Sequence, residues 1–448
     1  MHSPQDARDI AESLVERGIA AGASAADALY VQDRSSGVQV RLGELESVSR
    51  SEGEEVGLRL FVGQRSATVA SSDLSNQALS ILVDRCLAMA REAPEDPYAG
   101  LAPQELLQRG EPPALDSGDG IDPDPQELRA RALDAEQAAL AVAGVTNSGG
   151  AGASASGATL ALATSGGFSG AYRSTGHSCS ASVIAGEGAG MHRDFASHSA
   201  RHLEDLDKAA DIGRLAGERA VARFGAARPR PGRYPVLFDP RVSSTLLGHF
   251  SGAISGSAIA RKTSFLMDKL GSRVFGEEVT IVDDPLRLRG LRSRPFDAEG
   301  LNVTRQELVA GGILNSWIAE SASARQLGIE PTGHAARGAA GAPAASPSNL
   351  YMEAGRRSRE ELFAAFSEAV LIIELIGQGV NGVTGDYSRG AVGFMVRGGE
   401  IAEPVAEITI ASNLIDMFAS LEPGSDLELR RGVDAPTILV PEMVIAAA

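Results

Sequence analysis

Short β-type segments separated by turns recur through the first 190 residues, and they restrict the chain to folds built on hairpins. Four such segments lie at 28–31, 37–42, 56–62 and 66–70 and are rich in Val, Leu and aromatic residues. From Val145 to Gly190, small residues, Ser and Gly alternate with Leu, Val and Phe. Period-two alternation with Gly-rich turns predicts antiparallel hairpins, the first set forming a meander.

Helical patterns flank these segments. In 4–21 the apolar residues fall on one helical face, and in 125–143 Asp124 can cap a helix that Pro125 begins. Two further helices are predicted at 75–90 and 203–224. Strands and helices arranged in this way predict an α+β fold.

The C-terminal half begins with a predicted strand at 234–238 and a helix from Asp239 that carries His249. After it, strands and turns predominate, which predicts a mostly antiparallel-β, barrel-like domain. Residues 334–348, rich in Ala, Gly and Pro, are predicted to be a mobile loop. The expected organisation is an N-terminal α+β domain (1–100), a linker (101–122), a central α+β segment packed with the N-terminal domain (123–227) and the C-terminal β-rich domain (228–448).

Composition excludes several classes of protein. The net charge of −17, with no run of Lys or Arg, argues against nucleic-acid binding. No stretch approaches about 18 uninterrupted apolar residues, so no membrane span is expected. The two cysteines have no metal-type spacing and exclude a disulfide framework, and the first 22 residues lack the apolar region of a signal peptide. These features predict a cytoplasmic location.

The segment 246–256 matters for what it lacks. A zinc peptidase helix needs two histidines about a turn apart and a glutamate to accept a proton from the metal-bound water. Here His249 is the single histidine among Gly, Ala, Ser and Phe, without a neighbouring carboxylate. A histidine in such surroundings is usually a packed core residue.

Several C-terminal motifs together resemble the TldD/PmbA family, and within it the PmbA (also called TldE) branch. The most specific is Gly377-Gln378-Gly379-Val380-Asn381-Gly382-Val383-Thr384-Gly385-Asp386-Tyr387-Ser388-Arg389-Gly390. Supporting motifs include Arg261-Lys262-Thr263-Ser264-Phe265-Leu266 and Pro404-Val405-Ala406-Glu407-Ile408-Thr409-Ile410. The resemblance covers nearly the whole chain and is strong from about residue 232.

The resemblance implies a role in peptide hydrolysis shared with a second subunit. TldD-type subunits are zinc peptidases that cut unfolded or extended peptides, and PmbA-type subunits pair with them as heterodimers. The ligand positions of the TldD-type helix fall on Gly248 and Ala253, its glutamate position on His249, and the C-terminal cysteine position near Ala435. The expectation is therefore a non-catalytic subunit without a cofactor of its own, whose partner holds zinc. Whether the chain forms a homodimer when alone stays open.

Four residues are predicted to be substrate-channel or interface groups: His249, Asp386, Tyr387 and Arg389. The last three are expected to form an exposed polar rim on a Gly-rich loop. An Asp386–Arg389 pair that only stabilises the turn is the alternative reading.

Two rival functions stay open. His192, His198 and His202 lie within eleven residues, and an unrecognised metal site there would make the chain an active metallopeptidase. Solvated histidines at a strand–helix junction are the alternative reading of this cluster. The second rival is a non-enzymatic adaptor that modulates another protein.

Overall fold

A six-stranded antiparallel sheet forms one half of the molecule, in the order β3-β2-β1-β4-β5-β6. The structure is a computed structural model that describes residues 2–447. Register pairs β1 with β4 from Asp27 opposite Thr164 to Val40 opposite Ala151, so one sheet runs through residues 25–200. The strands are β1 (Ala25–Arg41), β2 (Glu44–Val62), β3 (Arg65–Ser71), β4 (Val145–Thr164), β5 (Ser169–Ala185) and β6 (His192–Ala200).

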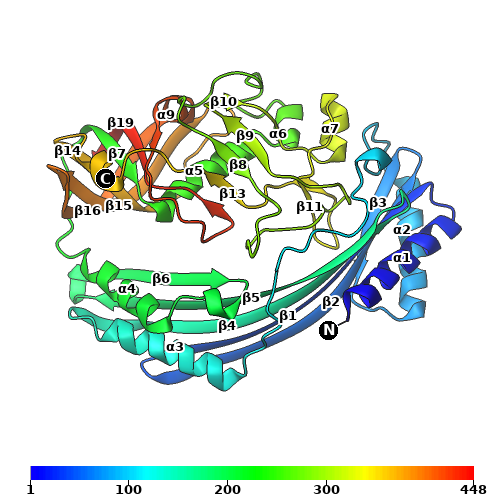
Figure 1. The fold of residues 1–448 in the computed structure, drawn as a ribbon, viewed down its shortest axis with the longest axis horizontal. Helices are drawn as coiled ribbons and strands as arrows, with labels where there is room; N and C mark the ends of the chain where they lie inside the picture. Colours follow the sequence, from blue (N-terminus) through cyan, green and yellow to red (C-terminus); the bar gives the residue numbers. More distant parts are fainter. Residues whose placement is uncertain (1, 448) are drawn as a thin grey trace.

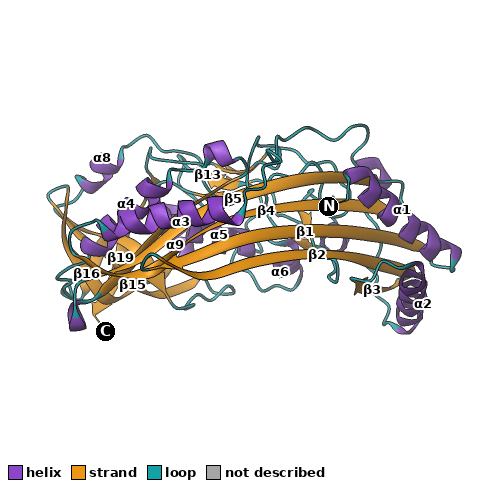
Figure 2. Cartoon of the chain, turned by 90° about the horizontal axis from the view of Figure 1, so that it is seen from below, coloured by secondary structure: helices purple, strands orange, loops and turns teal. Residues whose placement is uncertain are grey.

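Four helices cover one face of this sheet: α1 (Pro4–Ala20), α2 (Asn76–Glu92), α3 (Pro125–Leu140) and α4 (Ala209–Val221). Side chains with even numbers in β1 point to this face. Ala26, Ala28 and Tyr30 pack with α1 and α2, whereas Val38 and Val40 pack with α3 and α4. In Figure 2 the long strands extend from α3 and α4 at one end of the sheet to α1 and α2 at the other.

Local capping explains where two of the predicted helices begin. Asp124 accepts hydrogen bonds from the N–H groups of Gln126 and Glu127, and the Glu127 carboxylate accepts one from the Asp124 N–H. Ser75 caps α2 in the simpler one-sided way. The helix expected at 203–224 is shorter, because a 3₁₀ turn at Leu203–Asp205 precedes α4.

The C-terminal half contains a closed five-stranded barrel, which confirms the barrel-like expectation and the α+β class. Its order is β16-β15-β14-β7-β19, and pairing of β16 with β19 closes it. Only β7 and β14 run parallel; the other neighbours are antiparallel. The strands are β7 (Gly232–Phe238), β14 (Glu368–Ile376), β15 (Asp386–Arg397), β16 (Glu400–Asn413) and β19 (Ile438–Ala447).

Helix α5 (Pro240–Ala253) follows β7 and packs against the barrel. Leu246, Leu247 and Phe250 are buried with strand residues such as Phe238 and Ile408. A second, smaller sheet consists of β8 (Ile281–Asp283), β9 (Gln306–Ala310), β10 (Ile313–Leu314), β13 (Leu350–Met352) and β18 (Val433–Asp434). The remaining elements are α6 (Gly256–Ala260), α7 (Ser321–Leu327), α8 (Arg359–Phe363), α9 (Leu414–Ser420), β11 (Ala335–Ala336), β12 (Ala344–Ala345) and β17 (Glu422–Pro423).

The uncovered face of the large sheet packs on the C-terminal half (Figure 1). Leu29 and Leu162 from the sheet are buried with Phe296 and Leu301. Glu299 lies in the same region, and burial together with the neighbouring Asp297 raises the pKa of its carboxyl to about 7. Its carboxylate accepts hydrogen bonds from the N–H and the hydroxyl of Ser321.

The loop 334–348, predicted to be mobile, is instead fixed to the large sheet. Arg337 has a side chain only 2% exposed, and its Nη1 lies 2.5 Å from Oδ1 of Asp27 on β1. Arg59 on β2 pairs with the other oxygen of the same carboxylate, also at 2.5 Å. At Gly57 a side chain would be 1.8 Å from the carbonyl oxygen of Ala339, so the loop backbone lies directly against the strand.

The segment 101–122 also follows the surface of the sheet. Asp119 accepts hydrogen bonds from the N–H of Leu203 at 2.7 Å and of Ile121 at 2.9 Å. Nε2 of the buried His177 on β5 lies 3.1 Å from the same carboxylate. Although burial opposes ionisation of Asp119, these backbone hydrogen bonds and His177 lower the pKa of the carboxyl to about 2.

Candidate functional site

A pocket of about 280 Å³ lies beside the last turns of α5. The helix buries Leu246, Leu247 and Phe250 and leaves Gly248 and Gly252 exposed at the pocket. A side chain at either glycine would meet no heavy atom within 4 Å. The sequence of α5 thus gives an apolar inner face and an open outer face whose backbone is accessible.

His249 is the polar side chain that α5 contributes to this pocket. Its ring packs edge-on against Tyr387, with 6.0 Å between the ring centroids. Burial lowers the pKa of the imidazole, and the nearby Arg389 guanidinium lowers it further. The buried Nε2 atom has no hydrogen-bond partner within residues 2–447. The lowered pKa keeps the imidazole of His249 neutral at pH 7, and its Nε2 is a buried polar atom without a hydrogen bond in the described chain.

Strand β15 places the other predicted residues on opposite faces. Tyr387 and Arg389 point inward and are 1% and 9% exposed, so the expectation of an exposed rim is wrong for both. Asp386 points outward and bonds with Thr384 and Asn413. Because residues three apart in a strand face opposite sides, Asp386 and Arg389 do not form the alternative turn-stabilising pair; Nε of Arg389 donates to the Ile376 carbonyl at 3.4 Å.

Tyr387 is a buried phenol whose hydroxyl has no hydrogen-bond partner in the described part of the chain. Burial raises its pKa, so the group stays protonated at physiological pH. The structure thus brings His249, Tyr387 and Arg389 together and leaves Asp386 outside this group.

Residues outside the predicted set complete the pocket: Thr263, Phe265, Gln378, Val380, Gly382 and Leu414. Most of them stand in segments that carry the resemblance to the TldD/PmbA family, so the motifs contained the signal. The long-range pairing that brings those segments to α5 could not be inferred from one sequence.

The residues present do not fit a zinc ion. A catalytic zinc site needs about three protein ligands, and the positions implied by the resemblance hold Gly248, Ala253 and Ala435, which have no donor side chain. Among residues 2–447, no three His, Cys, Asp or Glu side chains are grouped so that they could hold a metal ion.

The histidines of the 192–202 cluster each have a separate environment. His192 packs near Phe224, with 6.3 Å between ring centroids. Nδ1 of His198 accepts a hydrogen bond from the Asp207 N–H at 3.0 Å, and Nε2 of His202 donates to the Asp116 carbonyl at 3.0 Å. His198 lies on β6 and not on a helix. His198 and His202 therefore do not share the helical face on which an i,i+4 pair could bind a metal.

Sequence profiles of one family match almost the whole chain. The PmbA/TldA metallopeptidase C-terminal domain matches residues 231–447, the central domain 118–224 and domain 1 residues 26–90. Metalloprotease PmbA of Escherichia coli is 36% identical over 98% of this chain and 96% of its own length. The PmbA homologue of Haemophilus influenzae is 35% identical over 99% of this chain and 96% of its own length.

Solved structures show the same architecture. A protein from Bacteroides thetaiotaomicron, described as a proposed modulator of DNA gyrase, superposes with a TM-score of 0.92 at 25% identity over the full length of both chains. TldE from Thermococcus kodakarensis has a TM-score of 0.85 at 19% identity, covering 97% of this chain and 99% of its own, and shows the fold alone. Sequence profiles, full-length relatives and fold agree, and the chain belongs to the PmbA/TldD metallopeptidase family.

Proposed function

We propose that this chain is the PmbA/TldE-type subunit of a TldD/TldE-like metallopeptidase complex that hydrolyses unfolded or extended peptides, and that the chain itself is non-catalytic. The observation that carries the proposal is the outer face of α5, which has a lone neutral His249 between Gly248 and Gly252. Zinc, its ligands and the general base would belong to a TldD-type partner. The full-length relatives, which are named metalloprotease PmbA, support a role in proteolysis.

In this proposal the α5 pocket contacts the partner or the peptide. A neutral imidazole can exchange a hydrogen bond with a peptide group, and the exposed helix backbone at the two glycines allows another chain to approach closely. Tyr387 and Arg389 would act behind it, Tyr387 by packing on the ring and Arg389 by keeping the ring neutral.

The proposal includes a cytoplasmic complex that does not bind nucleic acid. Cys86 and Cys179 are free, buried thiols, as a reducing compartment favours. The acidic net charge of −17 disfavours contact with a phosphate backbone. No helix within residues 2–447 is long and apolar enough to cross a membrane.

The test combines metal content with activity. The chain is purified without a metal-binding tag, and its zinc is measured by elemental mass spectrometry; we expect near-zero zinc per chain. Hydrolysis of an unfolded peptide is then measured with the chain alone, the TldD-type partner alone and both together. We expect cleavage only with both.

Two outcomes refute the proposal. About one zinc per chain would mean that this chain has its own metal site, and alanine variants of His192, His198 and His202 would be the next measurement. Full activity of the partner alone, without binding to this chain, would exclude a shared complex. His249→Ala is the site variant and His198→Ala its matched control, because both remove a partly buried imidazole.

A further inference from the structure

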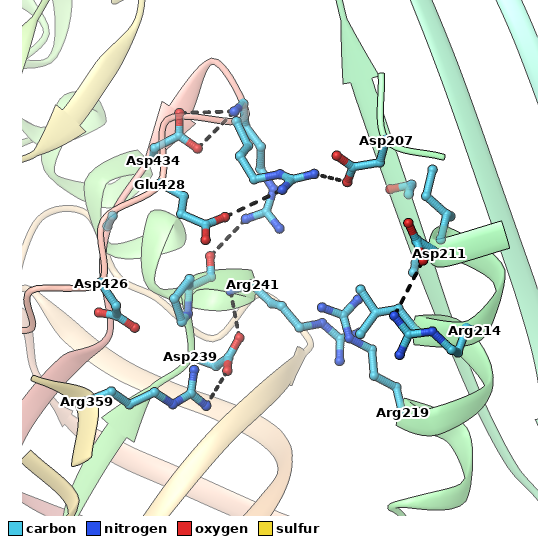
Figure 3. Close-up of a pocket in the computed structure, with 18 residues that line it drawn as sticks. Asp207, Asp211, Arg214, Arg219, Asp239, Arg241, Arg359, Asp426, Glu428 and Asp434 are labelled. Carbon is cyan, nitrogen blue, oxygen red and sulfur yellow. Dashed lines mark hydrogen bonds and ion pairs between the residues drawn. The ribbon is translucent and has the colours of Figure 1, made fainter. Parts of the chain in front are cut away.

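A second and larger cavity, of about 440 Å³, lies between the two halves of the molecule (Figure 3). One wall consists of α4 and the end of β6; the other consists of the start of α5 and the loop before β18. Arg241 in this wall precedes His249 by eight residues, roughly 12 Å along the helix axis. The cavity is thus distinct from the pocket beside His249.

Most arginines of this cavity have a carboxylate partner. Arg214 pairs with Glu218 at 2.8 Å, Arg359 pairs with Asp239 at 2.8 Å, and Arg430 pairs with Asp207. Such pairs account for the charge of these side chains and leave little reason to expect a ligand at them.

Two arginines of the lining form no ion pair within residues 2–447, and each donates to a backbone carbonyl instead. Nη1 of Arg431 donates to the Pro240 carbonyl at 2.9 Å. Nη1 of Arg219 donates to the Phe195 carbonyl at 3.2 Å. Burial lowers the pKa of this guanidinium to about 10, and the neighbouring Arg241 adds to the effect. Figure 3 shows the side chains of Arg219 and Arg241 pointing toward one another from opposite walls.

The acids near this point form their ion pairs with other arginines. Asp194, a buried carboxylate, lies 2.6 Å from Arg241 and 3.6 Å from Arg223. Arg223 also pairs with Glu374 at 2.9 Å. Asp194 and Glu374 thus engage Arg241 and Arg223, and Arg219 has no ion-pair partner within residues 2–447, although the six arginines that line the cavity are matched in number by six carboxylates.

We infer that this cavity binds the carboxylate of a short peptide, with Arg219 as its main anchor. A guanidinium presents several N–H groups that match the two oxygens of a carboxylate. Asp207, Asp211 and Glu428 belong to the same lining, and these acids disfavour a polyanion. The volume lies within the range of small-ligand pockets.

The assignment is tested on this chain alone, without partner or zinc, so it can fail or succeed independently of the proposed peptidase complex. Binding of trialanine and of trialanine amide is measured by isothermal titration calorimetry at low ionic strength. We expect the free acid to bind at least tenfold more tightly than the amide. Arg219→Gln should weaken binding of the acid at least tenfold.

Arg214→Gln is the matched control, because it removes the same charge from the same helix but from a side chain that Glu218 already engages. It should change the affinity less than twofold. Equal binding of the acid and the amide to the unaltered chain would overturn the proposal, as would unchanged binding by Arg219→Gln. Tighter binding of inorganic phosphate than of trialanine would overturn the assignment to a peptide.

Discussion

Replacing Arg337 by methionine should loosen the junction between the large sheet and the C-terminal half. Arg337, Asp27 and Arg59 form a network whose side chains are 2%, 3% and 10% exposed. Removing one partner of a buried ion pair typically costs 3–5 kcal/mol, because the remaining charge stays buried. Since Arg59 still pairs with Asp27, we expect the lower end of this range, about 3 kcal/mol.

The assay is urea unfolding at pH 7, followed by circular dichroism, with hydrogen exchange of residues 335–340 as a local measurement. Arg305→Met is the control, because the Arg305 side chain is 43% exposed and its guanidinium pairs with Glu307 and Glu353 on the surface. Exposed pairs contribute about 0–1 kcal/mol. The reasoning would be refuted if Arg337→Met lowered the free energy of unfolding by no more than Arg305→Met does.

Acid provides a second check on the same network. Burial alone would raise the pKa of Asp27, but Arg59 and Arg337 more than offset burial and lower it below its ordinary value of 3.8. A carboxyl whose folded pKa is lowered contributes stability above the unfolded pKa and loses it as the pH falls through the folded pKa. The free energy of unfolding of Arg337→Met should therefore be lower than that of the unaltered chain at pH 7, and this difference should shrink below about pH 4.

Three further changes test other parts of the fold. Gly57→Ala should lower stability by about 1–3 kcal/mol in urea unfolding, because the new methyl group meets the Ala339 carbonyl, whereas Gly53→Ala, which has ordinary contacts, should not. Relative to Glu299→Gln, the unaltered chain should lose about 1.4 kcal/mol per pH unit between the unfolded pKa near 4.5 and the folded pKa near 7, since only the folded state holds the proton there; parallel pH curves would contradict this. Asp119→Ala should cost about 1–3 kcal/mol at pH 7 and progressively less as the pH falls toward 2, and equal costs at pH 7 and pH 2 would refute the role of its ionised carboxylate.

The sequence predicted those parts of the fold that depend on local patterns. The period-two segments became the hairpins of the large sheet, and the Asp124–Pro125 start of α3 follows from capping within four residues. Closure of the barrel by β16 and β19, and the pairing of β1 with β4, join segments far apart in the chain. Such pairings depend on tertiary packing, which one sequence does not specify.

The loop 334–348 shows why composition misled. Small residues without periodicity are typical of mobile loops, yet here they allow the backbone to lie against β2 and Arg337 to reach Asp27. At the site, the polar residues from Asp386 to Arg389 suggested an exposed rim. In the structure β15 begins at Asp386 and extends through this segment. Because side chains alternate along a strand, Tyr387 and Arg389 are buried and Asp386 is exposed.

The glycines on the outer face of α5 allow the fold and the proposed contact to be separated. A methyl group added at Gly248 or Gly252 would meet no heavy atom within 4 Å, and glycine in a helix costs about 1 kcal/mol relative to alanine. Gly248→Ala and Gly252→Ala should each stabilise the isolated chain by up to about 1 kcal/mol. If a partner or peptide backbone approaches this face closely, the same variants should lower complex formation and peptide cleavage in the reconstituted mixture. Destabilisation of the isolated chain would show that the fold needs the glycines, and unchanged assembly and cleavage would show that no chain packs closely there.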